Sequence, residues 1–169
     1  MKVALLNPTP PDISAFGVRS LSAYLRSKGH ETTIVFYPGS IGLLQEGGEF
    51  VYRYTSGVID ETVRLCEDAD LIAISFFSSY YDRARQLAVE LKNRLGTPVI
   101  CGGIHPTTRP QQVLDFADMV CIGEGETALE ELLERMAAGE SDPDVQGIWK
   151  MRDGKLVDTG IRPLVQDLD

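Results

Sequence analysis

The run Leu71-Ile72-Ala73-Ile74-Ser75-Phe76 is the stretch of sequence that decides the fold. Apart from Ser75 it is apolar throughout, without the alternation of polar and apolar residues that indicates a strand with one face in water. A strand of this kind is typical of a parallel sheet that helices cover on both faces. Residues 83–95 follow with a helical pattern of apolar residues that ends at Gly96. The run therefore predicts a central strand followed by a helix.

The same alternation continues in both directions along the chain. Five strands separated by helices predict an α/β fold with a doubly wound parallel sheet, flavodoxin-like or Rossmann-like, in the strand order 2-1-3-4-5. The alternative order is that of a dinucleotide-binding half. Ser56 is the expected N-cap of the second helix. The predicted strands are residues 2–7, 32–37, 71–76, 98–101 and 119–122, and the predicted helices are residues 16–28, 56–67, 83–95, 111–115 and 126–138.

The end of the chain has a different pattern. Residues 147–151 and 156–159 flank the sequence Arg152-Asp153-Gly154-Lys155, in which Asp-Gly favours a tight hairpin turn. We expect residues 1–140 to form the α/β domain, and residues 141–169 to form a C-terminal β-hairpin and a linker toward a further domain.

One connection, residues 39–55, is long for a fold of this kind. Long connections are often functional, and an ordered excursion on the surface is equally compatible with this segment. Its role stays open at the level of sequence.

Composition and charge exclude several classes of protein. The chain of 169 residues carries 16 Lys and Arg against 25 Asp and Glu, a formal net charge of −9, and such a surface repels nucleic acid. No apolar run approaches the roughly 18 residues of a membrane span, and the first residues lack the apolar region of a secretory signal. We therefore expect a cytoplasmic protein with no membrane partner. Cys66, Cys101 and Cys121 are too far apart for a zinc or iron–sulfur site and are expected to be buried.

Ligands of open α/β sheets bind beyond the carboxyl ends of the strands, where the strand order reverses. Here that crevice lies between the first and third strands. Asn7 and Ser75 end those strands, where a phosphate-accepting receiver domain has acidic residues, and no GxxxxGK[ST] loop is present. Gly102-Gly103 removes side chains where the crevice opens, which is compatible with a tight turn or with a slot for a flat group. The spacing Gly123-x-Gly125 fits part of a dinucleotide fingerprint but follows the last strand.

Three short motifs follow one another on these elements. Asp12-Ile13-Ser14-Ala15-Phe16-Gly17, after the first strand, is similar to the DxHxxG motif of cobalamin-binding domains. Ser75-Phe76-Phe77 falls at the Ser-x-Leu motif of that family, and Gly102-Gly103 falls at its Gly-Gly motif. With residues 102–107, residues 118–127 and the hairpin, nearly the whole chain resembles the amino-terminal domain of cobalamin-dependent radical S-adenosylmethionine enzymes.

The resemblance implies a base-off cobalamin whose nucleotide tail enters the slot between the first and third strands. It also implies a radical domain, missing from this chain, that uses S-adenosylmethionine and a 4Fe-4S cluster for methyl transfer or ring formation on a small-molecule substrate. Ser14 stands where the motif has the histidine that ligates cobalt, so we expect a lower corrin face that is open, water-bound or capped by a side chain such as Phe16. The implied cofactor-binding residues are Asp12, Ser14, Phe16, Gly17, Ser75, Phe77, Ser78, Gly102, Gly103, His105, Gly123, Glu124 and Gly125.

Two other functions fit the same sequence. In the first, the domain has lost the cofactor and serves as a docking module, which Ser14 and the aromatic residues near the site favour. In the second, Glu124, Glu126 and His105 are the acid–base groups of a small-molecule enzyme. His105 is expected either as a hydrogen-bonded loop residue fixed by its following proline or as a contact to corrin side chains. Replacing Gly103 with a bulky residue distinguishes the cofactor-binding function from the docking function. The new side chain should abolish cobalamin uptake if the domain binds the cofactor, and activity should persist if the domain serves only for docking.

Overall fold

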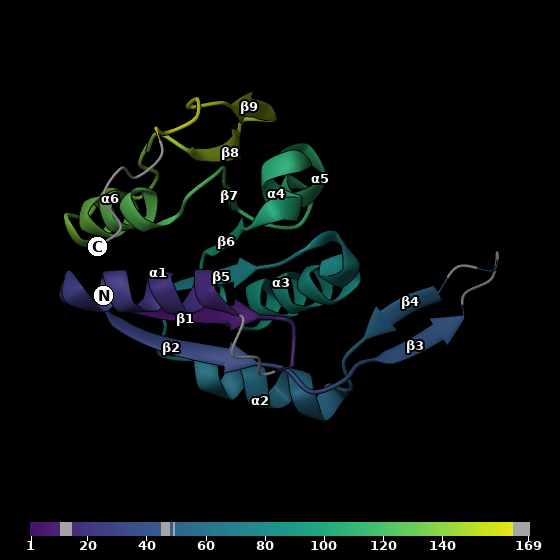
Figure 1. The fold of residues 1–169 in the computed structure, drawn as a ribbon. Coiled ribbons are helices and arrows are strands. Elements are labelled where there is room, and N and C mark those ends of the chain that lie inside the picture. Colours follow the sequence, from purple (N-terminus) through teal and green to yellow (C-terminus); the bar gives the residue numbers. More distant parts are fainter. Residues whose placement is uncertain (11–14, 45–47, 49, 164–169) are drawn as a thin grey trace.

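The computed structural model describes residues 1–10, 15–44, 48 and 50–163. Its main sheet has seven strands in the order β2-β1-β5-β6-β7-β8-β9 (Figure 1). The first five are parallel, and their order is the predicted 2-1-3-4-5, which confirms the predicted fold class. The parallel strands are β1 (Lys2–Asn7), β2 (Glu31–Phe36), β5 (Leu71–Ser75), β6 (Val99–Gly102) and β7 (Met119–Cys121).

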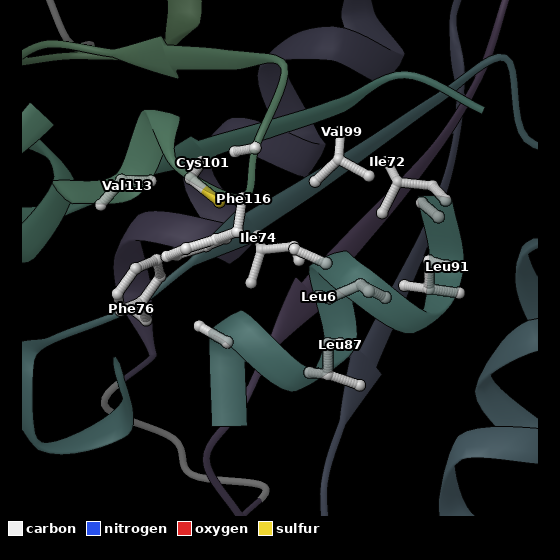
Figure 2. Packing of buried hydrophobic residues seen from close by; sticks show 14 of the residues in the cluster. Leu6, Ile72, Ile74, Phe76, Leu87, Leu91, Val99, Cys101, Val113 and Phe116 are labelled. Atoms are coloured by element: carbon white, nitrogen blue, oxygen red, sulfur yellow. The ribbon is translucent and has the colours of Figure 1, made fainter. Parts of the chain in front are cut away.

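Helices cover both faces of this sheet. They include α1 (Phe16–Ser27), α2 (Ser56–Cys66), α3 (Tyr81–Leu95), α5 (Pro110–Leu114) and α6 (Glu126–Ala137). Because residues along a strand alternate between the two faces, Leu5 and Ala73 pack with α1 and α6, whereas Leu6 and Ile74 pack with α2, α3 and α5. Figure 2 shows this second cluster from close by. None of the helices in the described ranges is long and apolar enough to cross a membrane.

Residues 41–44 and 50–53 form a separate two-stranded ribbon that was not predicted from the sequence. β3 (Ile41–Leu44) pairs antiparallel with β4 (Phe50–Arg53), and the ribbon extends away from the main sheet (Figure 1). Its base is attached to α3, because the Gln86 side chain accepts a hydrogen bond from the Tyr54 N–H at 2.8 Å and donates one to the Tyr54 carbonyl at 3.1 Å. The described parts of the long connection therefore form an excursion on the surface that is attached to α3.

Three local predictions are wrong. His105, expected on the loop after the fourth predicted strand, lies in the short helix α4 (Ile104–Thr108). Helix α3 begins at Tyr81, earlier than the predicted residue 83, because a turn of 3-10 helix, η1 (Ser78–Tyr80), leads directly into it. Thr55, not Ser56, is the N-cap residue of α2, and it makes no side-chain capping hydrogen bond.

The predicted hairpin extends the main sheet at its edge. β8 (Ile148–Arg152) pairs antiparallel with β7, and β9 (Lys155–Val157) pairs antiparallel with β8. Lys150 of β8 is buried, and its Nζ lies 2.5 Å from Asp142 Oδ1 and 3.0 Å from Asp144 Oδ1. The same ammonium donates a hydrogen bond to the Pro143 carbonyl at 2.7 Å. Its burial is tolerated because these oxygens replace the water that it loses.

Candidate functional site

A cavity of about 250 Å³ lies at the carboxyl ends of the central strands, between the sheet and the helices α1 and α6. Its floor consists of the residues that β1, β5, β6 and β7 direct toward these two helices, and its roof belongs to the helices themselves. The loops that follow β6 and β7 complete its rim. The lining includes Leu5, Ala73, Ser75, Ile100, Gly102 and Cys121 on the floor, Gly17, Val18, Leu21, Glu126 and Leu129 on the roof, and Gly103, Gly123, Glu124 and Gly125 on the rim.

The cavity exists because several positions that face it are glycines. A Cβ atom placed on Gly102 would meet only the Cβ of Cys121, at 3.7 Å, which is ordinary van der Waals contact. A Cβ atom on Gly125 would lie 3.8 Å from side-chain atoms of Leu21 and Leu129. Any larger side chain at Gly102 or Gly125 would occupy the cavity without requiring the backbone to move. Gly102 and Gly125 therefore leave open a space that side chains at these two positions would fill.

Gly103 is a glycine for a second reason, which is its backbone. Its φ of +98° and ψ of −170° lie in a region that only glycine adopts readily. A Cβ atom there would approach the Phe76 carbonyl oxygen to 2.9 Å and the Ser75 Oγ to 3.2 Å. The N–H of Phe76 donates to the Gly102 carbonyl at 3.1 Å, so the loops after β5 and β6 touch at this point. The backbone therefore turns at Gly103 with a positive φ, and the cavity beside Gly102 is free of side chains from these two positions.

The cavity brings together seven of the thirteen residues that the resemblance implies as cofactor-binding. Phe16 lies beside them, at the first position of α1, with its side chain 71% exposed. Phe77 and Ser78 are exposed on the segment after β5 and do not line the cavity. Asp12 and Ser14 lie outside the described residues. The seven that line it are Gly17, Ser75, Gly102, Gly103, Gly123, Glu124 and Gly125.

His105 lies behind the rim and not in the cavity, because helix α4 turns its ring toward α3. The side chain is buried, with its ring centroid 5.4 Å from that of Phe76 and 5.0 Å from that of Tyr81. Its Nδ1 is 2.9 Å from the Ser78 Oγ. Burial lowers the pKa of His105 below its ordinary value of 6.5, so the imidazole is neutral at pH 7.

The acidic side chains at the cavity are separated from the candidate acid–base residue His105. Glu126 accepts a hydrogen bond from the Ser20 hydroxyl at 3.4 Å, and Glu124 lines the rim, but His105 does not join them. Burial raises the pKa of the Cys121 thiol to about 12, so this side chain stays protonated. In the part of the chain that the structure describes, no cluster of three or more His, Cys, Asp or Glu side chains is placed to hold a metal. The acid–base set proposed from the sequence is therefore not assembled.

The apolar roof of the cavity was not predicted from the sequence. Val18 and Leu21 come from α1, and Leu129 comes from α6. Their helical spacing was indistinguishable from that of ordinary core residues such as Leu25, which is fully buried further along α1. These three residues differ from ordinary core residues in their position, because they lie toward the amino-terminal ends of α1 and α6, opposite the glycines that line the cavity.

A glycine-lined apolar cavity at the carboxyl ends of the parallel strands lies where open α/β domains bind their ligands. The family model of the B12 binding domain matches residues 2–133. The chain therefore belongs to the B12-binding domain family.

Curated relatives match almost the whole chain. An anaerobic magnesium-protoporphyrin IX monomethyl ester cyclase from Synechocystis sp. is 26% identical over 182 residues, which cover 100% of this chain and 34% of the relative. A cytidylyl-2-hydroxyethylphosphonate methyltransferase from Streptomyces wedmorensis is 30% identical over 186 residues, which cover 99% of this chain and 34% of the relative. The chain thus spans about a third of the length of these proteins.

Solved structures of cobalamin-dependent radical enzymes have the same fold. The radical S-adenosylmethionine methyltransferase TsrM from Kitasatospora setae, with cobalamin and a 4Fe-4S cluster bound, matches with a TM-score of 0.74 and 17% identity over 98% of this chain and 30% of that chain. The cobalamin-dependent S-adenosylmethionine radical enzyme OxsB, with aqua-cobalamin bound, matches with a TM-score of 0.69 and 18% identity over 96% of this chain and 22% of that chain.

Proposed function

We propose that this domain binds cobalamin in the base-off form and positions it for a radical S-adenosylmethionine domain of the same protein, in the cytoplasm. The observation that carries the proposal is the cavity that Gly102, Gly103 and Gly125 leave free of side chains. At about 250 Å³ it is smaller than the roughly 300–1,000 Å³ of pockets that enclose a whole drug-sized ligand. The nucleotide tail of the cofactor enters this cavity, and the corrin lies outside it, across the carboxyl ends of the strands.

The lining residues suit a flat heteroaromatic group. Val18, Leu21 and Leu129 offer apolar contacts from the helices, and Ser75 offers a hydroxyl beside the bare backbone of Gly103. Contacts of this kind orient the group, and bound cobalamin supplies the reactivity of its cobalt–carbon bond. In this proposal, the chain itself binds the cofactor and orients it.

The lower face of the corrin receives no histidine in this proposal. No histidine is among the described residues that line the cavity, and the Nδ1 of His105 is already paired with Ser78. Phe16, exposed at the start of α1 and next to the cavity-lining Gly17, covers that face instead. Ser14, at the motif's histidine position, is a poor cobalt ligand by its chemistry.

The activity of the whole protein is part of the same proposal. The relatives include a cyclase and a methyltransferase, and each is about three times as long as the stretch that matches this chain. We assign S-adenosylmethionine, a 4Fe-4S cluster and a small-molecule substrate to that further region, with methyl transfer or ring formation as the reaction. Residues 141–169 then include the linker that leads to it.

Titration with hydroxocobalamin, followed by visible absorbance and gel filtration, tests the binding step. We expect the wild-type domain to retain cobalamin and the variant Gly102→Leu to lose more than about tenfold in affinity, because the new side chain occupies the cavity. Gly102 is a better test position than Gly103, where any side chain also strains the backbone. Gly57→Leu, on the exposed start of α2, is the matched control and should bind as the wild type does. No co-elution of cobalamin with the wild type, at roughly tens of micromolar, contradicts the proposal.

A docking module without a cofactor is the second candidate. The exposed aromatic side chains favour it: Phe16 is 71% exposed, Phe77 is 55% exposed, and Phe50 on β4 is 62% exposed. In the full-length protein, Gly102→Leu separates the two functions, because it abolishes activity only if the cavity holds a cofactor.

A further inference from the structure

Helix α4 contacts both loops that flank the Gly102-Gly103 turn. It begins directly after Gly103, and the Thr107 N–H donates to the Gly103 carbonyl at 3.1 Å, which joins the helix to the cavity rim. Two side chains then leave α4 in different directions. His105 reaches the segment after β5, and Thr107 reaches the segment after β7.

The contact of Thr107 fixes the loop after β7. The N–H of Gly123 donates to the Thr107 Oγ1 at 3.1 Å. Gly123 has a φ of +81°, and a Cβ atom added there would meet nothing within 4 Å. This loop continues through Glu124 and Gly125, which also line the cavity. The Thr107 hydroxyl is therefore one of the contacts that define this rim segment. The others include the Ile122 N–H, which donates to the Gly147 carbonyl at 2.8 Å, and the Cys121 thiol, whose Sγ lies 3.8 Å from the Glu124 carbonyl oxygen.

The contact of His105 fixes the segment after β5 in a similar way. Its ring is stacked on Phe76 and tilted against Tyr81, which sets its direction, and its Nδ1 pairs with the Ser78 Oγ at 2.9 Å. Ser78 is exposed at the start of η1, one residue after the exposed Phe77. The His105 N–H also approaches the Phe76 carbonyl, at 3.4 Å. The buried imidazole therefore pairs with the exposed Ser78 at the start of η1, while Tyr80 at the end of η1 packs against the core.

We propose that Thr107 and His105 are positioning residues for the cavity, which hold its two flanking loops at the separation that a ligand group requires. Neither the Thr107 hydroxyl nor the His105 imidazole needs to contact the ligand. The inference rests on the proposed function for its ligand, but its structural part stands without it. Its physical basis is that glycine-rich loops lose the most conformational freedom when they are ordered, so fixing them beforehand lowers the cost of binding.

The Thr107 contact is tested by removing its hydroxyl and then restoring it. In Thr107→Val, we expect the Gly123 amide hydrogen to exchange at least about tenfold faster in the unliganded protein, because its acceptor is gone. Hydroxocobalamin affinity should fall by about threefold to tenfold, the worth of one hydrogen bond. Thr107→Ser keeps the acceptor and should restore both properties. Thr108→Val, which removes a hydroxyl bonded only to carbonyls within α4, is the matched control and should change neither.

The His105 contact is tested with a pair of substitutions. His105→Phe keeps a ring between Phe76 and Tyr81 but cannot pair with Ser78, so affinity for hydroxocobalamin should fall by about threefold to tenfold. His105→Asn places an amide near the position of Nδ1 and should recover part of this loss. In the unliganded protein, the amides of residues 78–80 should exchange faster in His105→Phe than in His105→Asn.

The outcomes separate this inference from the function on which it rests. If the wild type does not bind hydroxocobalamin, the proposed function fails, and the exchange of the Gly123 amide still decides whether Thr107 fixes the loop. If the wild type binds and Thr107→Val binds equally well, with unchanged exchange at Gly123, the positioning role is wrong. Equal affinities of His105→Phe and the wild type contradict the role of His105.

Discussion

Gly102 and Gly103 are adjacent, but the structure requires them to be glycine for different physical reasons. The backbone of Gly102 is ordinary, and the absent side chain leaves part of the cavity open. The backbone of Gly103 has a positive φ, and its absent Cβ allows the Phe76 carbonyl to come close. The absent side chain of Gly102 therefore keeps space open in the cavity, and that of Gly103 also permits the backbone conformation of the turn.

Alanine substitutions at these two positions should separate the two reasons. We expect Gly103→Ala to lower the free energy of unfolding by about 1–3 kcal/mol from the backbone conformation alone. Gly102→Ala adds a methyl group in ordinary contact with Cys121 and should change it by less than about 1 kcal/mol. Urea unfolding followed by circular dichroism measures both. Equal stabilities of the two variants would show that the turn relaxes around a Cβ atom at position 103.

The sequence predicted the members of the candidate site unevenly. Glycines at the carboxyl ends of strands are visible in a sequence, and Gly102, Gly103 and Gly125 do line the cavity. The direction of His105 was not predictable, because it depends on helix α4, whose five residues include a proline and carry no periodic signal. Whether a single residue faces the cavity or the core is decided by such short elements.

At the scale of secondary structure elements, predictability follows burial. The parallel strands are buried on both faces, so their apolar runs predict them well, as β5 illustrates. β3 and β4 lie outside the main sheet, with Ile41 and Phe50 more than half exposed, and their four-residue strands have no core that would impose a pattern. Asp153-Gly154 predicted the β8–β9 turn because both residues must adopt positive φ there.

The β8–β9 hairpin should make the stability of the domain sensitive to acid. Hydrogen bonds from Arg152 and Lys150 lower the pKa of Asp144 from 3.8 to about 2 in the folded state, and hydrogen bonds from the same two residues lower the pKa of Asp142. A lowered folded-state pKa stabilises the protein above the unfolded value, and this stabilisation is lost as the pH falls from about 4 through about 2. The free energy of unfolding should therefore decrease over this interval.

Asp144→Asn isolates this contribution. The variant should be less stable than the wild type at pH 7, by about 1 kcal/mol or less because the carboxylate is half exposed, and the difference should shrink toward pH 2. Asp153→Asn, at the turn of the same hairpin, is the control for loss of a negative charge. Parallel stability curves for the wild type and Asp144→Asn between pH 7 and pH 2 would contradict the role of this ion pair.

For the whole molecule, the two faces of the sheet have different roles. The face covered by α2 and α3 is filled by a continuous apolar cluster around Leu6, Ile74 and Phe76 (Figure 2). The face covered by α1 and α6 is well packed near Leu25 and Leu132 and opens into the cavity toward the carboxyl ends. Polar bridges join α1 to α6 along this face, since Tyr24 and Lys28 both bind Glu130. One face thus stabilises the fold, and the other keeps space for a ligand.

This division predicts how a ligand should stabilise the whole domain. A ligand that binds only the folded state at about 100 times its Kd adds about 2.7 kcal/mol, which raises Tm by roughly 5–10 °C for a domain of this size. Hydroxocobalamin should produce such a shift, measured by scanning calorimetry. Cobinamide has the corrin but lacks the nucleotide tail, so at equal concentration it should produce a much smaller shift if the tail occupies the cavity. In Gly102→Leu the two compounds should become equivalent, because the variant blocks only the tail. Equal shifts by both compounds in the wild type would place the binding energy on the corrin and leave the cavity without a ligand.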